Sequence, residues 1–516
     1  MQLIIPMSGV GQRFLDAGFD LPKPLIQIGS QPMLKYVVDM FPNVTEILFI
    51  ANTDHLSDKT LNLKGVLESL GTKVRVIGIP PHKKGPAWAV KQAAEYVDLE
   101  GPVTVNYCDF SCDWNFEGFA QKLGSGIDGL ISTYTGFHPH MLNNNKYAYV
   151  QKDSNGHVSD IQEKNSYSDD PMSEEASSGT YGFRSGRLLL TMIEEQIARN
   201  HQYNNEYYMS LTYKNLIENG GKVETFLIEQ FCQWGTPEDF LEFESHRNFF
   251  LNHKLSPPKI SGVERVALLG AGAGSRFTSA GYSTPKPFLP INNSCLVMNS
   301  MKSFGEKIPQ RDILLQNNVH VPSLINEEFE KENIEVFNIE GLSQGQASSA
   351  KFMLDKLHTS NCIIATCDSI LIPKNDDYSH ISGKTLAVWT VKPNEFSKKY
   401  PNQFGWVRSN TDNEVKDVRV KDLPDKFDNW RVITGNFMVG NTVMASELIA
   451  KFEASEQRVN GEFYLDSLLM FAKNEGWNVL ELIPIAFESL GTPDEYQTFL
   501  YWERFFLKHP EYLEAK

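Results

Sequence analysis

The chain has 516 residues and carries 48 Lys and Arg against 64 Asp and Glu, which gives a formal net charge of −16. Proteins that track nucleic-acid phosphates normally present a basic face, so this balance argues against nucleic acid as a main partner. No run of apolar residues is long enough to span a bilayer and no secretory leader is recognisable, so we expect a cytoplasmic protein without membrane insertion.

Short apolar runs alternate with amphipathic stretches along the first half of the chain. The runs at 2–6, 46–51, 74–79, 102–107 and 129–134 are predicted strands, and 33–40, 61–70, 87–97 and 116–123 are predicted helices. This alternation predicts an α/β fold with a largely parallel, doubly wound sheet. Ligands of such sheets bind beyond the carboxyl ends of the strands.

A glycine loop follows the first predicted strand. It contains Gly9, Gly11 and Arg13, and Lys23 follows between two prolines. Glycine lets the backbone N–H groups approach phosphate oxygens, and flanking prolines stiffen the chain around the lysine. The loop lacks the third glycine of a dinucleotide motif and the G-K-[ST] of a P-loop. A simple turn is the alternative reading of the two glycines; the arginine and lysine favour a nucleotide site.

The same grouping recurs 263 residues later, at Gly272, Gly274, Arg276 and Lys286. A period this long exceeds that of solenoid repeats, so each copy is predicted to be a complete domain. Further matches follow in the same order in both halves: Asp109 and Asp368, Lys164 and Lys421, Gly179 and Gly435, Glu206 and Glu462, and G-T-P at 235–237 and 491–493.

The join between the copies is a polar stretch punctuated by prolines. We predict domain 1 at residues 1–255, a linker at 256–262 and domain 2 at 263–516. Because the linker is short, the two domains are expected to touch, and an oligomer is compatible with the sequence.

The combination of glycine loop, arginine, P-K-P, strand-end aspartate and E-K resembles the sugar-1-phosphate nucleotidyltransferase family, also called nucleoside-diphosphate-sugar pyrophosphorylases. The resemblance covers nearly the whole chain, and G-T-P-E-D at 235–239 is similar to the branch found in bacterial capsule and lipopolysaccharide gene sets. It implies two tandem Rossmann-like nucleotidyltransferase domains. It also implies Mg²⁺-dependent transfer of a nucleotidyl group from a nucleoside triphosphate to a sugar-1-phosphate, with release of pyrophosphate, for surface polysaccharide biosynthesis.

The resemblance also assigns roles in the first copy. Arg13 would hold the β- and γ-phosphates, Lys23 the α-phosphate and Asp109 the Mg²⁺, with a helix cap as the alternative for Asp109. The remaining roles are Gly85 at the base pocket, Glu163 for sugar hydroxyls, Lys164 for the phosphate of the sugar phosphate, and Gly179 and Glu206 near the sugar, with a helix start as the alternative for Glu206. The second-copy counterparts are Arg276, Lys286, Gly345, Asp368, Lys421, Gly435 and Glu462.

Two departures from the family pattern leave alternatives open. The second metal-binding aspartate is replaced by Gln233 and Ser489, so substrate phosphates, water or the acids at 238 and 239 would complete the Mg²⁺ shell. Val420 stands where the first copy has Glu163. Alternative functions are therefore cytidylyl-type transfer to a non-sugar phosphorylated alcohol, or a second domain that binds nucleotide for regulation without catalysis.

Other conspicuous residues are predicted to be structural. The six cysteines show no metal-type spacing and are expected to be buried free thiols. His138 and His140 flank a proline and are expected on the surface, and Trp88 is expected in the core.

Overall fold

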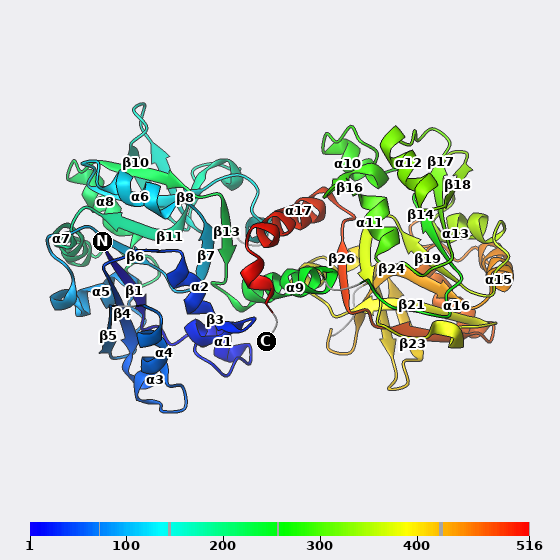
Figure 1. Ribbon diagram of the computed structural model, residues 1–516, viewed down its shortest axis with the longest axis horizontal. Helices are drawn as coiled ribbons and strands as arrows, with labels where there is room; N and C mark the ends of the chain where they lie inside the picture. The colour runs from blue at the N-terminus through cyan, green and yellow to red at the C-terminus, as the bar shows by residue number, and fades with distance from the viewer. Residues whose placement is uncertain (72, 143–145, 255–256, 423–426, 515–516) are drawn as a thin grey trace. The chain divides into compact units, whose positions relative to one another are not determined.

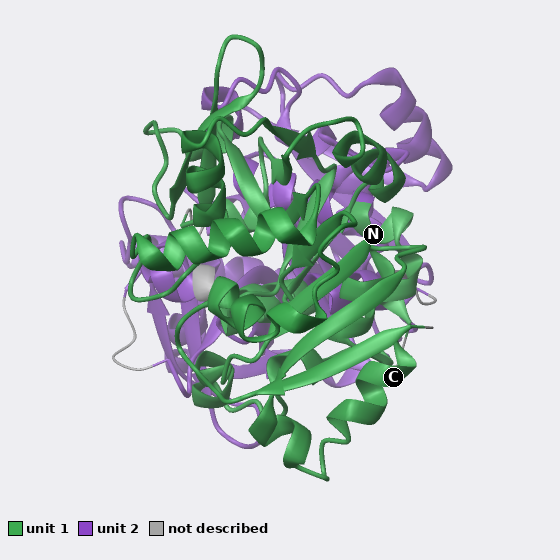
Figure 2. Cartoon of the chain, turned by 90° about the vertical axis from the view of Figure 1, so that its left-hand side faces the viewer, with its two compact units in different colours: residues 1–245, 505–516 green, residues 246–504 purple. Residues whose placement is uncertain are grey.

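The computed structural model describes residues 1–71, 73–142, 146–254, 257–422 and 427–514. The chain forms two compact units (Figure 2): unit 1 contains residues 1–245 and 505–516, and unit 2 contains residues 246–504. This division differs from the boundary predicted near residue 256. Helix α9 (Pro237–Lys254) continues through the division at 245/246, and residues 255 and 256 lie outside the described part of the chain.

Unit 1 is built on one mixed sheet. Its centre is parallel, with β6, β1, β4 and β5 side by side, and the antiparallel strand β11 joins it to the remaining strands. In sheet order the main path is β10 (Val158–Glu163), β9 (Ala148–Lys152), β11 (Glu175–Phe183), β6 (Val103–Asn106), β1 (Gln2–Met7), β4 (Glu46–Asn52) and β5 (Val74–Ile79), while β8 (Gly129–Tyr134) pairs with β11 and β12 (Val223–Leu227).

Helices flank this sheet, and the apolar side chains of α5, α7 and α8 form one core cluster with its strands. The parallel strands read as continuous apolar runs because they are buried on both faces, as in β1, where every residue is buried. The helices of unit 1 are α1 (Gln12–Asp16), α2 (Met33–Asp39), α3 (Thr53–Ser57), α4 (Leu63–Ser69), α5 (Pro86–Gln92), α6 (Phe116–Leu123), α7 (Gly186–Ala198) and α8 (Ser210–Glu218).

Unit 2 repeats this topology strand for strand (Figure 1). The path is β18 (Ile334–Ile339), β17 (Gln310–Gln316), β14 (Arg265–Leu269), β19 (Cys362–Thr366), β24 (Arg431–Val439), β21 (Thr385–Val391) and β25 (Asn478–Leu482), with β22 (Gly405–Ser409) between β24 and β23 (Val415–Val420). Its helices are α10 (Ser275–Ser279), α11 (Leu296–Lys302), α12 (Ser323–Lys331), α13 (Gln346–Leu354), α14 (Glu395–Lys399), α15 (Thr442–Ala454), α16 (Leu465–Asn474) and α17 (Pro493–Lys508).

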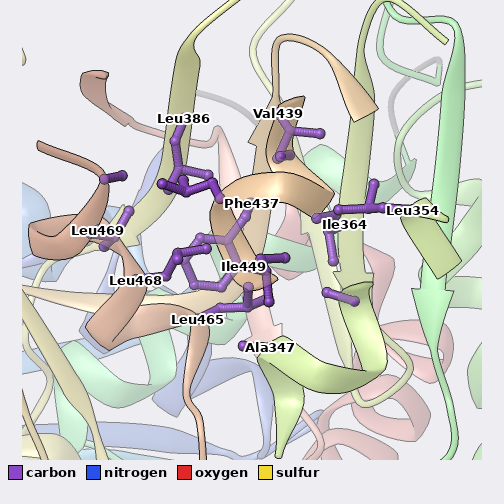
Figure 3. Packing of buried hydrophobic residues seen from close by; sticks show 14 of the residues in the cluster. Ala347, Leu354, Ile364, Leu386, Phe437, Val439, Ile449, Leu465, Leu468 and Leu469 are labelled. Atoms are coloured by element: carbon purple, nitrogen blue, oxygen red, sulfur yellow. The ribbon is translucent and has the colours of Figure 1, made fainter. Parts of the chain in front are cut away.

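The core of unit 2 joins helices α13, α15 and α16 to the sheet. Phe437 of β24 packs in one cluster with Leu465 and Leu468 of α16 (Figure 3). Each unit also has two two-stranded ladders. Those of unit 1 are β7 (Phe110–Asp113) with β13 (Gln230–Gln233) and β2 (Gln27–Ile28) with β3 (Gln31–Pro32), and those of unit 2 are β20 (Ser369–Ile372) with β26 (Ala486–Ser489) and β15 (Pro290–Ile291) with β16 (Ser294–Cys295). The fold predicted from the sequence, two tandem Rossmann-like domains, is confirmed.

The last residues of the chain complete unit 1 rather than unit 2. The Tyr512 ring stacks on Tyr36 with a centroid separation of 4.3 Å, and its hydroxyl donates to Ser111 Oγ at 2.8 Å. Lys508 forms an ion pair with Asp113, which His509 also contacts. The two cations hold the pKa of Asp113 below its usual value although burial opposes this. The sequence did not predict this contribution.

Two smaller predictions were wrong. His138 and His140 are buried, not exposed, because they pack in an aromatic cluster with Tyr134. His140 Nε2 lies 3.1 Å from the Tyr134 hydroxyl, and burial lowers the pKa of both histidines. Trp88 is half-buried rather than in the core. The cysteines are free, and all are buried except the half-buried Cys108. Within the described ranges, no helix combines the length and apolar character needed to cross a membrane.

Candidate functional site

The glycine loop has the same backbone in both units. Gly11 caps α1 with φ +70°, and Gly274 caps α10 with φ +61°, a left-handed conformation that side chains rarely adopt. Gly9 and Gly272 lie in exposed backbone, where an added Cβ would meet no atom within 4 Å. Glycine is therefore required by conformation at Gly11 and Gly274, and it leaves the backbone uncovered at Gly9 and Gly272.

Arg13 and Arg276 are exposed, and the residue after each is a buried aromatic that anchors the loop. Phe14 packs edge-on against Phe19 and Phe240. In unit 2 the corresponding trio is Phe277, Tyr282 and Tyr496. The arginines thus extend toward solvent from a rigid base.

Lys23 meets Asp109 at the carboxyl end of the parallel strands. Its Nζ lies 2.5 Å from Asp109 Oδ2, donates to the Gly235 carbonyl at 2.7 Å, and lies 5.1 Å from the centroid of the Phe14 ring. The lysine side chain is only 14% exposed. Three segments distant in sequence therefore fix one ammonium group beside one carboxylate.

Unit 2 reproduces this pair. Lys286 Nζ lies 2.6 Å from Asp368 Oδ2 and donates to the Gly491 carbonyl at 3.2 Å. Burial alone would lower the pKa of Lys286, but the carboxylate of Asp368 raises it above its usual value. Burial would raise the pKa of Asp368, but the ammonium holds it below. Both groups are therefore charged at neutral pH.

A further acid lies close to each pair. Thr236 Oγ1 donates to Asp239 at 2.9 Å, and Thr492 Oγ1 donates to Glu495 at 3.0 Å. Burial raises the pKa of Asp239 to about 6 and also raises the pKa of Glu495. Glu238 is exposed. Of the two acids considered from the sequence, Asp239 is therefore the one near the Lys23 pair, although no group of three or more His, Cys, Asp or Glu suited to a metal ion occurs in the described ranges.

Lys164 and Lys421 share an uncommon backbone. Their φ angles are +58° and +53°, in the left-handed region that costs a lysine free energy. Lys164 Nζ donates to the Tyr208 hydroxyl at 2.5 Å, and Lys421 Nζ donates to Tyr464. Both ammonium groups lie 4.4 Å from the centroids of those tyrosine rings. The tyrosines, which the sequence did not single out as partners, fix both lysines in the same place.

Glu163 precedes this lysine and faces helix α8. Ser210 Oγ donates to Glu163 Oε2 at 2.5 Å. Burial raises the pKa of Glu163, while the Ser210 hydrogen bond and the Lys164 charge oppose the rise. The carboxylate of Glu206 also raises this pKa, so both predicted acids share one electrostatic environment. Ser210 is a site residue that sequence reasoning missed.

Glu206 ends a two-residue turn and does not start a helix. Tyr203 and Glu206 exchange two backbone hydrogen bonds of 3.0 Å, and Asn204 and Asn205 between them both have positive φ. Val459 and Glu462 make the same turn in unit 2. Asparagine is among the few residues that adopt this conformation readily, which explains the Asn-Asn and Asn-Gly pairs at this point. Glu206 is half-buried, whereas Glu462 is exposed.

Gly85 and Gly345 permit close backbone contact with this turn. A Cβ on Gly85 would lie 2.7 Å from the backbone N of Tyr207, and one on Gly345 would lie 2.6 Å from the backbone N of Phe463. The two segments are joined by backbone hydrogen bonds, as from Tyr207 N to Lys84 O at 2.8 Å. Glycine at these two positions therefore allows the segment before α5 or α13 to pack directly against the turn that carries Glu206 or Glu462.

Gly179 and Gly435 lie inside long strands and have φ +107° and +79°. Side chains there would approach Phe110 at 2.9 Å and Thr366 at 3.0 Å. The register of β11 against β8 shifts around Gly179. Both glycines thus place bare backbone within each sheet near the strand ends that carry Asp109 and Asp368.

The sites differ on the side of Trp88. The ring of Trp88 stacks on the Tyr207 ring, and the Lys84 ammonium lies 4.1 Å from the centroid of the Trp88 ring. His82 Nε2 lies 3.0 Å from Ser8 Oγ of the glycine loop. In unit 2 the corresponding residues are Ala271, Leu342 and Ser348. The surroundings of the glycine loop are thus more polar and aromatic in unit 1.

One family model matches the first half of the chain. The family model described as nucleotidyl transferase matches residues 3–247, which is almost the whole N-terminal segment of unit 1. No curated protein matches the chain.

Several solved structures match part of the chain. The nucleoside-diphosphate-sugar pyrophosphorylase of Vibrio cholerae RC9 is 22% identical, with a TM-score of 0.39 over 46% of this chain and 98% of that chain. A putative glucose-1-phosphate thymidylyltransferase from Bacillus anthracis is 17% identical, with a TM-score of 0.39 over 47% of this chain and 93% of that chain. The inositol-1-phosphate CTP transferase from T. maritima is 15% identical, with a TM-score of 0.37 over 48% of this chain and 97% of that chain.

The family match falls on the unit that carries Gly11, Lys23 and Asp109, and unit 2 repeats both the topology and these residues. Residues 3–247 match the nucleotidyl transferase family model, and unit 2 repeats the topology of unit 1; the chain is a nucleotidyltransferase with two tandem domains of this fold.

Proposed function

We propose that the protein transfers a nucleotidyl group from a nucleoside triphosphate to a sugar-1-phosphate, forming a nucleoside-diphosphate sugar and pyrophosphate. We place this reaction in the cytoplasm, where nucleoside triphosphates are supplied, and assign its product to surface polysaccharide biosynthesis. The observation that carries the proposal is the buried Lys–Asp pair beside each glycine loop, at 2.5 Å in unit 1 and 2.6 Å in unit 2.

The reaction requires no protein nucleophile. An oxygen of the acceptor phosphate attacks the α-phosphorus, the bond from that phosphorus to the bridging oxygen breaks, and pyrophosphate leaves with the electron pair. The protein contributes positioning and charge stabilisation. Lys23 suits the α-phosphoryl group because its ammonium is held by both Asp109 and the Gly235 carbonyl and needs no reorganisation. Arg13, exposed on the loop, would hold the β- and γ-phosphates.

The residues present fit Mg²⁺. Asp109 offers a partly exposed carboxylate at the strand end, and the buried acid Asp239 is near enough to Lys23 for the ammonium charge to favour its ionised form. Mg²⁺ prefers one or two carboxylates together with phosphate oxygens and water, so the absence of the aspartate at Gln233 is compatible with binding. When bound, the ion would supply additional neutralisation of the triphosphate charge. Asp109 would hold it, and Lys23 would remain beside the α-phosphate.

The acceptor phosphate would bind at Lys164. Its ammonium is fixed by Tyr208, and Glu163 and Glu206 lie close enough to accept hydrogen bonds from sugar hydroxyls. The left-handed backbone at Lys164 supports a functional role because strain of this kind is retained where a side chain must be aimed. The same backbone at Lys421 supports an acceptor-phosphate site in unit 2 as well.

The direct test is pyrophosphate release by the purified protein with Mg²⁺, each common nucleoside triphosphate, and a panel of sugar-1-phosphates and other phosphorylated alcohols. Release with one or two pairs supports the proposal and identifies base and acceptor. Release only with a non-sugar phosphorylated alcohol would replace the sugar in the proposal. Nucleotide binding without release for any pair would contradict it and favour a regulatory function.

A regulatory second unit is the other candidate function. The intact Lys286–Asp368 pair and the strained Lys421 favour catalysis in unit 2 instead. Asp368→Asn separates the two functions, because a regulatory unit 2 would leave release with every acceptor unchanged.

A further inference from the structure

The two acceptor sites differ at a row of positions that crosses three neighbouring strands. In unit 1, Glu163 of β10 pairs with Ala148 of β9, and Ser177 of β11 lies beyond it. In unit 2, Val420 of β23 pairs with Gly405 of β22, and the Ile433 side chain of β24 lies 3.0 Å from where a Gly405 Cβ would be. The row is polar in unit 1 and apolar in unit 2.

The helix that covers this row shows the reverse difference: its residue facing the row is uncharged in unit 1 and acidic in unit 2. Helix α8 packs on β10 and presents Ser210 to Glu163 in unit 1. Helix α16 packs on β23 in unit 2, and its residue corresponding to Ser210 is Asp466. At these positions each unit therefore has one carboxylate, on the strand in unit 1 and on the helix in unit 2.

The absence of a side chain at Gly405 leaves the space that the Asp466 carboxylate occupies. A Cβ at Gly405 would collide with Asp466 Oδ2, although Gly405 itself occupies the place of an alanine in unit 1. Loss of that methyl group makes room for the carboxylate above the sheet. Three substitutions, Ala to Gly, Glu to Val and Ser to Asp, thus form one compatible set.

The Asp466 carboxylate is held in unfavourable surroundings. Burial raises its pKa to about 7, although Lys421 and the helix start both favour the charged form. Tyr181, which accepts a hydrogen bond from Ser177 in unit 1, is replaced by the apolar Phe437. Leu465 beside Asp466 points into the core and fixes the start of α16 (Figure 3). A carboxyl placed at a stability cost beside a phosphate-binding lysine is more consistent with ligand binding than with packing.

We infer that Asp466 performs in unit 2 the hydroxyl-recognition role of Glu163, so that the second site selects a different phosphorylated alcohol from the first. Its acceptor presents a hydroxyl toward α16 and an apolar carbon surface toward Val420, with its phosphate on Lys421. This inference rests on the proposed function and specifies the acceptor of its second site.

The test uses the full chain with unit 1 silenced by Lys23→Met and Asp109→Asn, so that pyrophosphate release reports unit 2 alone. In this background Asp466→Asn, which keeps the shape of the side chain, is expected to raise the acceptor KM by about 10-fold or more, as expected for loss of a charge-assisted hydrogen bond. The KM for the nucleoside triphosphate should change less than about twofold, which also shows that the variant is folded. The loss should be smaller at pH 6 than at pH 8, because wild-type Asp466 is largely protonated at pH 6 beside its neighbour Lys421.

The exchange variant Gly405→Ala/Val420→Glu/Asp466→Ser installs the unit 1 set in unit 2. Its ranking of the acceptor panel should move toward that of a chain with unit 2 silenced by Lys286→Met and Asp368→Asn. An unchanged ranking together with an unchanged acceptor KM for Asp466→Asn would overturn the inference alone. If the chain with unit 1 silenced released no pyrophosphate with any acceptor, catalysis by unit 2 and the inference would both be overturned.

Discussion

The two units have the same residues and distances at their proposed phosphate sites. They differ in the residues that would contact the rest of the acceptor. The Lys–Asp distances are 2.5 and 2.6 Å, and the phosphate-site lysines lie 4.4 Å from their tyrosine rings in both units. By contrast, the acid proposed to contact the acceptor is Glu163 on a strand in unit 1 and Asp466 on a helix in unit 2. The two copies thus keep the same geometry at the proposed phosphate sites and differ in the groups proposed to discriminate between acceptors.

The units also differ in how they are completed. Unit 2 is one continuous segment, residues 246–504, whereas unit 1 requires residues 505–516 in addition to 1–245. The two domains therefore share one topology and similar sites, but only unit 1 includes a segment from the far end of the chain. The following experiments test these contrasts, beginning with the largest expected effect.

Removing the strand-end aspartate should silence one unit at a time. We expect Asp109→Asn to lower release at unit 1 on the order of 10³-fold, or about 4 kcal/mol of transition-state stabilisation, and Asp368→Asn to do the same at unit 2. The reason is that each carboxylate fixes the lysine proposed to act on the α-phosphate and would hold the metal. Pyrophosphate release with the acceptor preferred by each unit measures the effect. Asp39→Asn, at an exposed ion pair with Lys35, is the control and should have no effect.

Removing the Tyr512 ring should destabilise unit 1 selectively. The ring is buried and stacked on Tyr36, so Tyr512→Ala is expected to cost about 3 kcal/mol of folding free energy. Tyr512→Phe removes only the hydrogen bond to Ser111 and should cost about 1 kcal/mol. Heat inactivation followed separately with the substrates of each unit measures this. Equal loss of both activities would contradict a selective role.

Replacing the lysine proposed to bind the acceptor phosphate should weaken binding of the acceptor but not of the nucleoside triphosphate. Lys164→Met in unit 1 and Lys421→Met in unit 2 are each expected to raise the acceptor KM by about 10-fold to 100-fold, through loss of charge-assisted contacts. Initial rates at varied concentrations of both substrates measure the effect. A matching rise in the nucleoside triphosphate KM would show that these lysines do not distinguish the two substrates.

Asp466→Asn should stabilise unit 2 in a pH-dependent way. The pKa of Asp466 is raised to about 7 in the folded protein, so its charge penalises folding increasingly as the pH rises from the unfolded value of 3.8 toward 7. The asparagine variant lacks this penalty. Its advantage in denaturant unfolding should therefore be larger at pH 8 than at pH 5, by about 1 kcal/mol or more. A pH-independent advantage would show that the carboxyl does not titrate in this range.

Much of the fold was predictable because local patterns determine it. The predicted ranges 74–79, 129–134 and 116–123 coincide with β5, β8 and α6, each an apolar or amphipathic run with clear ends. Strands β9, β10 and β11 were not predicted, since β9 and β10 carry exposed positions and β11 is rich in Ser, Thr and Gly, so that none of them shows a continuous apolar run. The burial of His138 and His140 was missed because Phe231, which packs against His140, lies far away in the sequence.

The proximity of Lys23 and Asp109 was predictable because the segments bearing them follow β1 and β6, which are adjacent parallel strands. The left-handed backbone at Lys164 and Lys421 was not, since lysine gives no signal for that conformation. Asp466 was missed for another reason. Its counterpart in unit 1 is Ser210, so the repeat offers no matching acid, and only the packing of α16 on β23 brings Asp466 near Lys421.

The contribution of residues 505–516 to unit 1 also affects when unit 1 can complete its folding during synthesis. During synthesis, N-terminal domains generally fold first, as soon as their residues leave the ribosome. Here Tyr512 and Lys508, the partners of Tyr36 and Asp113, are translated after all of unit 2. A nascent chain stopped between the two units would thus carry an incomplete first domain. The contacts of Tyr512 and Lys508 that stabilise unit 1 can therefore form only after unit 2 has been synthesised.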